Sequence, residues 1–185
     1  MLETDRYALV QRLLHWLIAF LVLGALGVGM TLGFLGFEGT QATFGKMMTN
    51  ALYTGHKTFG VLILALMLLR LGIRSILGAP PYRSPLSGFE RVASRAVHSL
   101  LYVALLLMPV LGWLATAAGG YPVQFFAWNL PGLISKDQAL SEVLFSLHGM
   151  VGWVIVGLLV LHIGGAMQHW LIKRDGVMQR MSLFR

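Results

Sequence analysis

The chain has 185 residues, of which 57% are hydrophobic and only 11% are charged, and its formal net charge is +7. A soluble domain of this length would carry about 25% charged residues, so the composition excludes a soluble protein and indicates an integral membrane protein. Cysteine is absent, which excludes disulfides, thiolate metal ligands, iron–sulfur clusters and haem attached through Cys-x-x-Cys-His. There is no internal repeat or separate soluble segment, so we expect a single domain over residues 1–185.

Four apolar segments are long enough to cross a membrane, which takes about 20 mainly apolar residues. They cover approximately residues 13–37, 52–77, 92–118 and 143–172. We expect an outer loop over residues 38–50, a Pro- and Gly-rich turn at "GAPPYRSPLSG", and a long outer loop over residues 119–142 whose aromatic residues lie on the membrane surface as a lid. Short connections between antiparallel spans predict a bundle. The expected fold class is therefore all-α, an integral membrane four-helix bundle.

The distribution of basic residues predicts the orientation of this bundle. Of the 14 lysines and arginines, only Lys46, Lys57 and Lys136 fall on the side of the two outer loops. The others lie near the two termini or near the connection between the second and third spans. By the positive-inside rule both termini are cytoplasmic. Because topology accounts for the net charge, the charge gives no reason to expect a nucleic-acid partner.

Four histidines lie at matching depths in the four spans: His15, His56, His148 and His162. His148 and His162 are fourteen residues apart on one predicted helix, so both rings face the same way about 21 Å apart along its axis. His56 and His148 lie near the outer side, whereas His15 and His162 lie toward the inner side. The spacing therefore predicts two transverse pairs, one above the other.

Paired imidazoles without nearby carboxylates or thiolates favour one kind of metal group. Zinc would require three or four ligands in a tetrahedron, whereas two bis-histidine pairs suit two b-type haems. For a single histidine the alternatives are a helix–helix hydrogen bond or a proton relay; four residues paired in depth favour haem ligation. Small residues near the histidines could leave room for a flat macrocycle, although this signal is weak. They are Gly55, Gly60, Gly149, Gly152, Gly164 and Gly165. Gly29 and Gly33 instead form a GxxxG pattern, which is typical of close helix packing.

Two further histidines lie near the inner pair. His98 is at a depth similar to that of His15, so on spacing alone either could pair with His162. His169 is two turns beyond His162 on the same face, closer to the cytosolic surface. Spare imidazoles beside an inner haem suit a quinone site, because they can bond carbonyl oxygens and handle the protons of reduction. The alternative, a helix–helix hydrogen bond for His98 and an interfacial position for His169, remains open.

Arg70 and Arg74 interrupt the second span one turn apart. A buried arginine needs an anion, and haem propionates suit its bidentate guanidinium; both arginines are candidate propionate ligands. Alternatively, both mark the inner end of the span and extend to lipid phosphate. We prefer the propionate for Arg70, which lies fourteen residues from His56, and the lipid for Arg74.

Four segments resemble the spans of a known family: "LLHWLIAF", "TGHKTFGVLILALMLLRLGIR", "RAVHSLLYVALLLMPVLGW" and "SLHGMVGWVIVGLLVLHIGGAMQHW". They are similar to bacterial cytochrome b561, the small di-haem cytochromes linked to quinone, and more distantly to the cytochrome b subunits of nickel–iron hydrogenase and formate dehydrogenase. The resemblance covers nearly the whole chain, and the histidine spacing is its most specific part. It implies a protein of the bacterial inner membrane.

The resemblance also implies roles for the histidines. His15 and His162 would hold the inner haem, His56 and His148 the outer one, and His98 and His169 would lie beside ubiquinone. It implies electron transfer between an outer-face donor and ubiquinone. In some members the donor is superoxide, so the resemblance implies either superoxide:ubiquinone oxidoreductase (superoxide oxidase) activity or a plain electron-transfer role. The identity of the donor stays open, because Glu38, Asp137 and Glu142 cancel the formal charge of the three lysines on the outer side.

Two other functions remain as alternatives. The chain could be the cytochrome b anchor of a hydrogenase- or dehydrogenase-type complex, with a redox protein as its partner. It could also be a haem-free proton or solute transporter that uses its histidines as a relay, although transporters usually show more spans, inverted repeats and broken helices.

Overall fold

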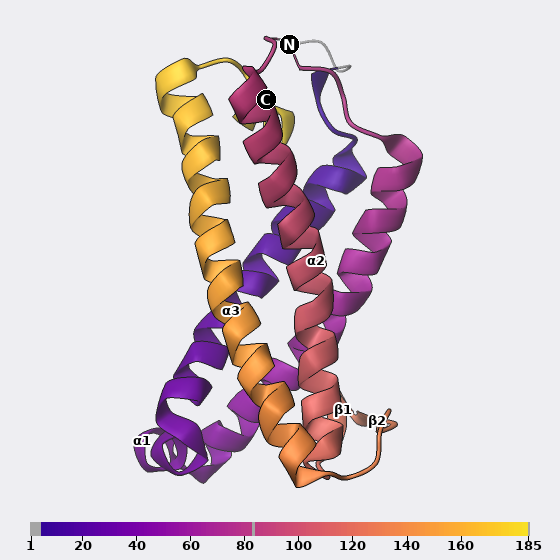
Figure 1. Cartoon of the computed structure of the whole chain (residues 1–185), viewed down its shortest axis with the longest axis vertical. Helices are drawn as coiled ribbons and strands as arrows, with labels where there is room; N and C mark the ends of the chain where they lie inside the picture. Colours follow the sequence, from indigo (N-terminus) through magenta and orange to yellow (C-terminus); the bar gives the residue numbers. More distant parts are fainter. Residues whose placement is uncertain (1–4, 83, 185) are drawn as a thin grey trace.

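A computed structural model of the chain describes residues 5–82 and 84–184 (Figure 1). Its elements follow in the order α1 (Leu9–Leu77), α2 (Gly88–Ala118), β1 (Val123–Phe125), β2 (Trp128–Leu130), α3 (Gln138–Met167), the π-helical turn η2 (Gln168–Lys173) and the short 3-10 helix η3 (Met178–Arg180). Within the described residues, α1, α2 and α3 with its η2 extension are long and apolar enough to cross a membrane.

Helix α1 folds back on itself. Its backbone leaves the helical region at Gly36 (φ 64°) and Gly45 (φ 77°), a conformation that glycine adopts without steric cost. The two ends of α1 lie side by side, because Gln11 Nε2 donates to the Gly78 carbonyl at 3.0 Å and Arg70 Nη1 donates to the Gln11 carbonyl at 3.0 Å. Figure 1 shows its arms meeting at the end of the molecule opposite the termini. The predicted spans 13–37 and 52–77 fall on these arms.

The predicted outer loop over residues 38–50 is wrong, because this segment is helical between and beyond the two glycines. Threonine hydroxyls bond back to carbonyls one turn earlier, from Thr40 to Gly36, from Thr43 to Gly39 (2.8 Å) and from Thr49 to Gly45 (2.9 Å). Glutamine, alanine, lysine and methionine between them are good helix formers. The two glycines therefore reverse the chain without an irregular loop.

Side-chain caps start the other two long helices. Ser87 and Glu90 form a capping box at α2, in which the Glu90 N–H donates to Ser87 Oγ and the Ser87 N–H donates to Glu90 Oε2. Asp137 accepts from the Leu140 N–H at 3.0 Å at the start of α3. Helix α2 packs mainly against α3 and less against α1, whereas the backbones of α1 and α3 hardly approach each other.

The buried apolar core occupies the middle of the bundle. It consists of two clusters, one of Ile18, Val22, Ile63 and Met67 and the other of Leu101, Ala104, Ile155 and Leu158. On α3, Ile155 and Leu158 lie between His148 and His162 in the chain. On α1, Ile18 and Val22 follow His15, and Ile63 and Met67 follow His56, so an apolar layer separates the two histidine depths. Large apolar side chains on the outside of the bundle, such as Phe20 and Val160, are exposed, as a lipid-facing surface requires.

A small β-hairpin, which was not predicted, covers part of the end of the molecule opposite the termini. Strands β1 and β2 pair antiparallel, with Phe125 opposite Trp128, and Phe126 in the turn has a left-handed φ of 53°. The hairpin is attached to α1: Lys57 Nζ donates to the Pro122 carbonyl at 3.0 Å, and the Phe126 N–H donates to Thr58 Oγ1 at 3.3 Å. The molecule is mostly helical, consistent with the expected all-α class, and the segment expected to form an aromatic lid contains one two-stranded hairpin.

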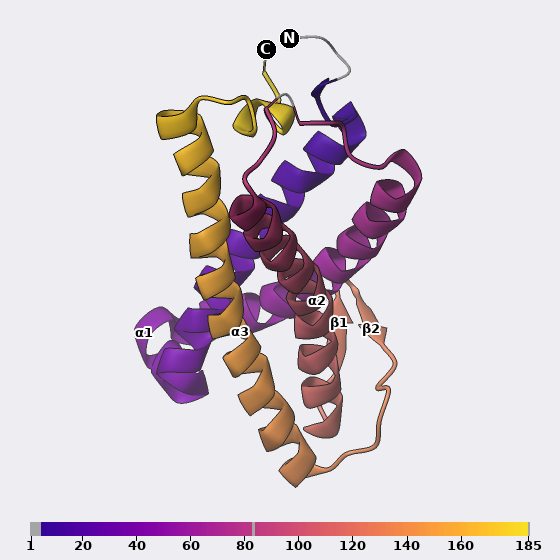
Figure 2. The same cartoon turned by 45° about the horizontal axis from the view of Figure 1, so that its top comes forward.

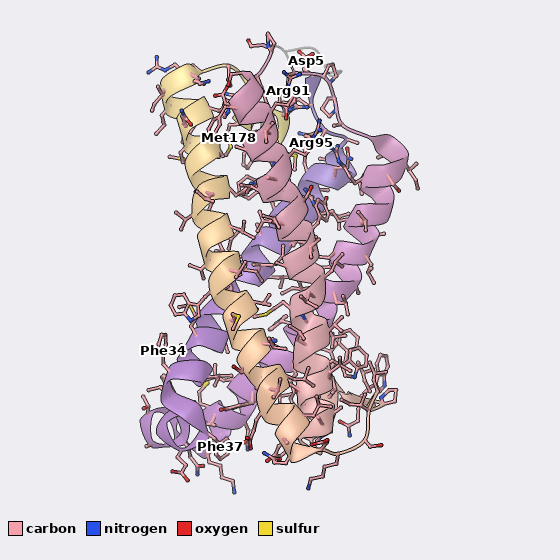
Figure 3. All side chains as sticks on the ribbon, in the orientation of Figure 1. Asp5, Phe34, Phe37, Arg91, Arg95 and Met178 are labelled. Atoms are coloured by element: carbon pink, nitrogen blue, oxygen red, sulfur yellow. The ribbon has the colours of Figure 1, made fainter. Side chains whose placement is uncertain are left out.

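Both termini lie at the same end of the molecule (Figures 1 and 2). The C-terminal segment is bound to the start of α1, since the Tyr7 N–H donates to the Arg180 carbonyl at 3.1 Å and Trp16 Nε1 donates to the Met181 carbonyl at 2.9 Å. In Figure 3, Arg91 and Arg95 lie toward this end and Phe37 toward the other. These two arginines and the termini therefore share one end, whereas Lys57 lies at the hairpin. Arg83 and Arg185 lie outside the described residues.

Candidate functional site

The four histidines at matching depths meet in two pairs across the space between α1 and α3. The ring centres of His56 and His148 are 6.0 Å apart, and those of His15 and His162 are 6.1 Å apart. In both pairs the ring planes are nearly perpendicular, at 82° and 78°. The structure thus brings together the pairs that the spacing predicted.

This geometry suits a metal held from two opposite sides. With metal–nitrogen bonds of about 2 Å, two axial imidazoles have ring centres roughly 6 Å apart. Among residues 5–82 and 84–184 there is no group of three or more histidine, cysteine or acidic side chains that could hold a metal, so a tetrahedral protein site does not fit. Haem supplies four equatorial nitrogens itself and needs only two axial ligands. The residues present therefore fit haem, because each pair supplies one imidazole from α1 and one from α3 at about the separation that two ligands of one iron require.

Contacts with neighbouring helical segments orient the rings of the outer pair. His148 Nδ1 donates to the Met108 carbonyl at 2.9 Å, which leaves Nε2 free for a ligand. The buried Nδ1 of His56 makes no hydrogen bond of good geometry among the described residues, although the ring interacts with the Ala25 backbone. A Cβ on Gly29 would lie 2.8 Å from His56 Cε1, and one on Gly112 would lie 2.9 Å from His148 Cε1. Each outer ring thus rests against a glycine of a neighbouring helical segment.

Sequence reasoning missed this role of Gly29 and Gly112, because the supporting glycine and its histidine are far apart in the chain. It pointed instead to glycines adjacent in sequence to the histidines. A Cβ on five of these would meet nothing within 4 Å: Gly55, Gly60, Gly149, Gly164 and Gly165. A Cβ on Gly152 would meet Met108 at 3.3 Å. These glycines therefore leave open space, whereas Gly29 and Gly112 make direct contacts.

Three histidines converge at the inner site. The ring centre of His98 lies 5.1 Å from that of His162, closer than that of His15. His98 Nδ1 donates to the Ser94 carbonyl at 2.6 Å, and its side chain is exposed. The ring-centre distance from His15 to His162 matches that of the outer pair, so His15 is the more suitable partner for His162.

The two candidate arginines have different surroundings. Arg70 is half-buried, bonded to the Gln11 carbonyl one turn before His15, and within electrostatic range of both His15 and His162. Arg74 Nη1 donates to the Gly78 carbonyl at 2.7 Å, and its guanidinium lies over the Tyr7 ring. Arg70 is thus beside the inner pair, whereas Arg74 caps the end of α1.

His169 lies apart from the inner pair, among acidic residues. Its Nδ1 donates to Asp175 Oδ2 at 2.6 Å, and its Nε2 lies 4.0 Å from Glu90 Oε1. Sequence reasoning did not identify Asp175 or Glu90. The available signal was their charge, because the end that carries the termini is otherwise strongly basic.

Comparison with known proteins gives full-length matches. A family model described as "Prokaryotic cytochrome b561" matches residues 6–182. "Cytochrome b561 homolog 2" of Escherichia coli K12 is 28% identical over 96% of this chain and 91% of its own length. "Cytochrome b561 homolog 1" of the same strain is 24% identical over 96% and 97%. "Cytochrome b562" of Cereibacter sphaeroides is 27% identical over 98% of each chain.

Proposed function

Because the chain belongs to the prokaryotic cytochrome b561 family of membrane b-type cytochromes, we propose that it is a di-haem protein that carries electrons across the bilayer from an outer-face donor to ubiquinone. The observation that carries this proposal is the presence of two histidine pairs, each with ring centres about 6 Å apart and separated by an apolar layer. His56 and His148 would hold the outer haem, and His15 and His162 the inner one. Bound haem supplies one-electron redox chemistry.

The chain's own residues prepare these sites. The Met108 carbonyl orients His148, and the apolar layer keeps water from the middle of the bundle. Arg70 carries a positive charge beside the inner pair and would bind the propionates of the inner haem. Arg74, which donates to the Gly78 carbonyl at the end of α1, is the less suitable propionate ligand.

We propose that a single domain spans the bacterial inner membrane four times, twice through the arms of α1 and once each through α2 and α3. The clustering of basic residues at the end with both termini supports a cytoplasmic location for that end. The hairpin β1–β2 would then face the outer side.

At the cytoplasmic side the proposed acceptor is ubiquinone, bound near His98 and His169. The proposed donor is superoxide at the outer face. Two superoxide anions would each lose one electron and become O₂, while one ubiquinone would gain two electrons and two protons and become ubiquinol. Imidazole supports this role because it can donate hydrogen bonds to carbonyl oxygens and exchange protons near neutral pH.

A direct test uses purified, haem-replete protein in lipid nanodiscs with a superoxide-generating enzyme and a short-chain ubiquinone. We expect ubiquinol formation that depends on the protein and is lost in His162→Ala, which should retain the outer haem spectrum. A preparation with both haems that forms no ubiquinol would contradict the proposed activity. Activity that appears only with a co-purifying iron–sulfur subunit would favour an anchor protein instead.

A further inference from the structure

A network of ionisable side chains lies at the cytoplasmic end of the α2–α3 interface. His169 on η2 donates from Nδ1 to Asp175, and its Nε2 faces Glu90 of α2. Lys173 donates to the same Glu90 carboxylate. The side chains of His169, Asp175 and Glu90 are only 12–16% exposed. With 7 acidic residues in the whole chain, two carboxylates on one imidazole indicate a specific arrangement.

The network is in register with the inner histidines. On α2, Glu90, Ser94 and His98 follow at intervals of four residues and share one face. His169 follows His162 by seven residues on the facing segment. The contact between Glu90 and His169 therefore lies about two turns, or roughly 10–12 Å, from the contact between His98 and His162. Ser94 lies between the two levels and bonds His98.

The backbone after His169 departs from α-helical geometry and brings Asp175 to the His169 ring. The α-helix widens into a π-helix at Gln168–Lys173, and Arg174 then adopts a left-handed φ of 52°. The chain turns back at that point, so that Asp175 meets a histidine six residues earlier. Departures to π-helix are rare and occur frequently at functional sites.

We propose that His169 is the proton donor for quinone reduction at the inner site and that Asp175 is its positioning residue. This inference rests on the proposed function. Reduction of one ubiquinone takes two electrons from the outer-face donor and two protons from the cytoplasm, and both carbonyl oxygens become hydroxyls. Protonated His169 would transfer its Nε2 proton to a quinone oxygen, and cytoplasmic water would restore it. Asp175 holds Nδ1–H, so proton exchange takes place at Nε2.

The two carboxylates have different roles. Hydrogen bonds from Lys173 and Ser87 hold the pKa of Glu90, which precedes the apolar part of α2, well below its ordinary value. Glu90 is therefore a fixed negative charge beside Nε2 and not a proton carrier. Asp175 uses Oδ2 for His169 and Oδ1 for the Val177 N–H at 3.2 Å. Both carboxylates lie beside the same imidazole, and Asp175 orients it as the carboxylate of a catalytic triad does.

The test compares wild type with Asp175→Asn, which keeps an acceptor for the Val177 N–H but removes the charge. Haem-replete protein in nanodiscs is reduced chemically and mixed with a short-chain ubiquinone, and the rate of haem reoxidation is followed against pH. We expect the rate of Asp175→Asn to fall about tenfold at alkaline pH and to approach wild type at acidic pH, where protons are abundant. Asp175→Glu should restore most of the rate. Asp137→Asn, at the α3 cap of the opposite end, should behave as wild type.

A second measurement does not depend on turnover. In ¹⁵N-histidine spectra of the reduced protein, with His169→Gln to assign the signal, wild type should show the Nδ1–H tautomer and Asp175→Asn a mixture. Equal pH profiles and equal tautomers in wild type and Asp175→Asn would overturn the role of Asp175 and leave the proposed function standing. Wild-type protein with both haems that fails to reduce quinone at any pH would overturn the proposed function and this inference together.

Discussion

The proposed chemistry depends on the histidine rings, and their pairing was predictable. Fourteen residues is close to a whole number of turns, so the sequence alone indicated that His148 and His162 face the same way. Matching depth in the spans indicated their partners, His56 and His15, and the structure places both rings on α1 about 6 Å from those of α3. It also adds the contacts with Gly29 and Gly112, which no local pattern could reveal because they join distant segments.

The contact between Gly29 and His56 predicts a selective loss. In Gly29→Ala the new Cβ would lie 2.8 Å from His56 Cε1, closer than carbon atoms pack, so the ring must shift from its position opposite His148. We expect loss of most of the outer haem with the inner one retained, measured by haem content and redox spectra. Gly33→Ala is the matched control, since its Cβ meets nothing within 4 Å. Equal haem content in the two variants would show that the contact is unimportant.

The inner site has two candidate partners for His162, and the structure favours His15. We expect His15→Ala to lose the inner haem and about half of the total, because its iron would lose an axial ligand. His98→Ala should retain both haems and lose quinone reduction. Haem quantification on both variants decides the matter, and the reverse pattern would assign the ligand to His98.

At the scale of helices and strands, the sequence pattern predicted the long helices but not the short or interrupted elements. The lengths of the apolar segments predicted the long helices correctly. They led to a wrong prediction of a loop at residues 38–50, because polar residues and two glycines interrupt the apolar pattern there. The hairpin β1–β2 was missed for another reason: its strands are three residues each, and Phe126 occupies a turn position where asparagine or glycine is usual. Tertiary hydrogen bonds to Thr58 and Lys57 hold it.

The hydrogen bonds of Thr58 predict what happens when the hairpin loses its attachment to α1. Thr58 is buried, donates to the Gln124 carbonyl and accepts from the Phe126 N–H. Thr58→Val keeps the shape but leaves both backbone groups unpaired, which costs about 1–3 kcal/mol. Faster amide hydrogen exchange over residues 121–130 is expected. In Thr43→Val, whose hydroxyl bonds only within α1, exchange there should be unchanged; an equally slow exchange in both variants would argue against this attachment.

At the scale of the whole molecule, composition predicted a membrane protein, and the family match confirms the resemblance drawn from four segments. The sequence could not predict how far apart the backbones of α1 and α3 lie, because this distance depends on how α2 packs against each of them. This separation, together with the apolar layer between the two histidine pairs, is consistent with the proposed two-site electron carrier.

The orientation in the membrane can be tested by cysteine labelling. The chain has no cysteine of its own, so only an introduced cysteine would react. Met47→Cys lies at the end opposite the termini and is highly exposed, whereas Ser84→Cys is exposed in the connection before α2. In intact inverted and right-side-out vesicles, a membrane-impermeant maleimide should label Met47→Cys only from the outer side and Ser84→Cys only from the cytoplasmic side. The opposite labelling would reverse the proposed topology.

The most direct measurement of the central claim is the number of haems per chain in purified, haem-replete protein, together with the same count in His56→Ala and His148→Ala. The proposed pairing predicts two b-type haems in the wild type, and it predicts that both variants lose the same one and keep the other. A wild type with no more than one haem per chain, or two variants that lose different haems, would contradict it.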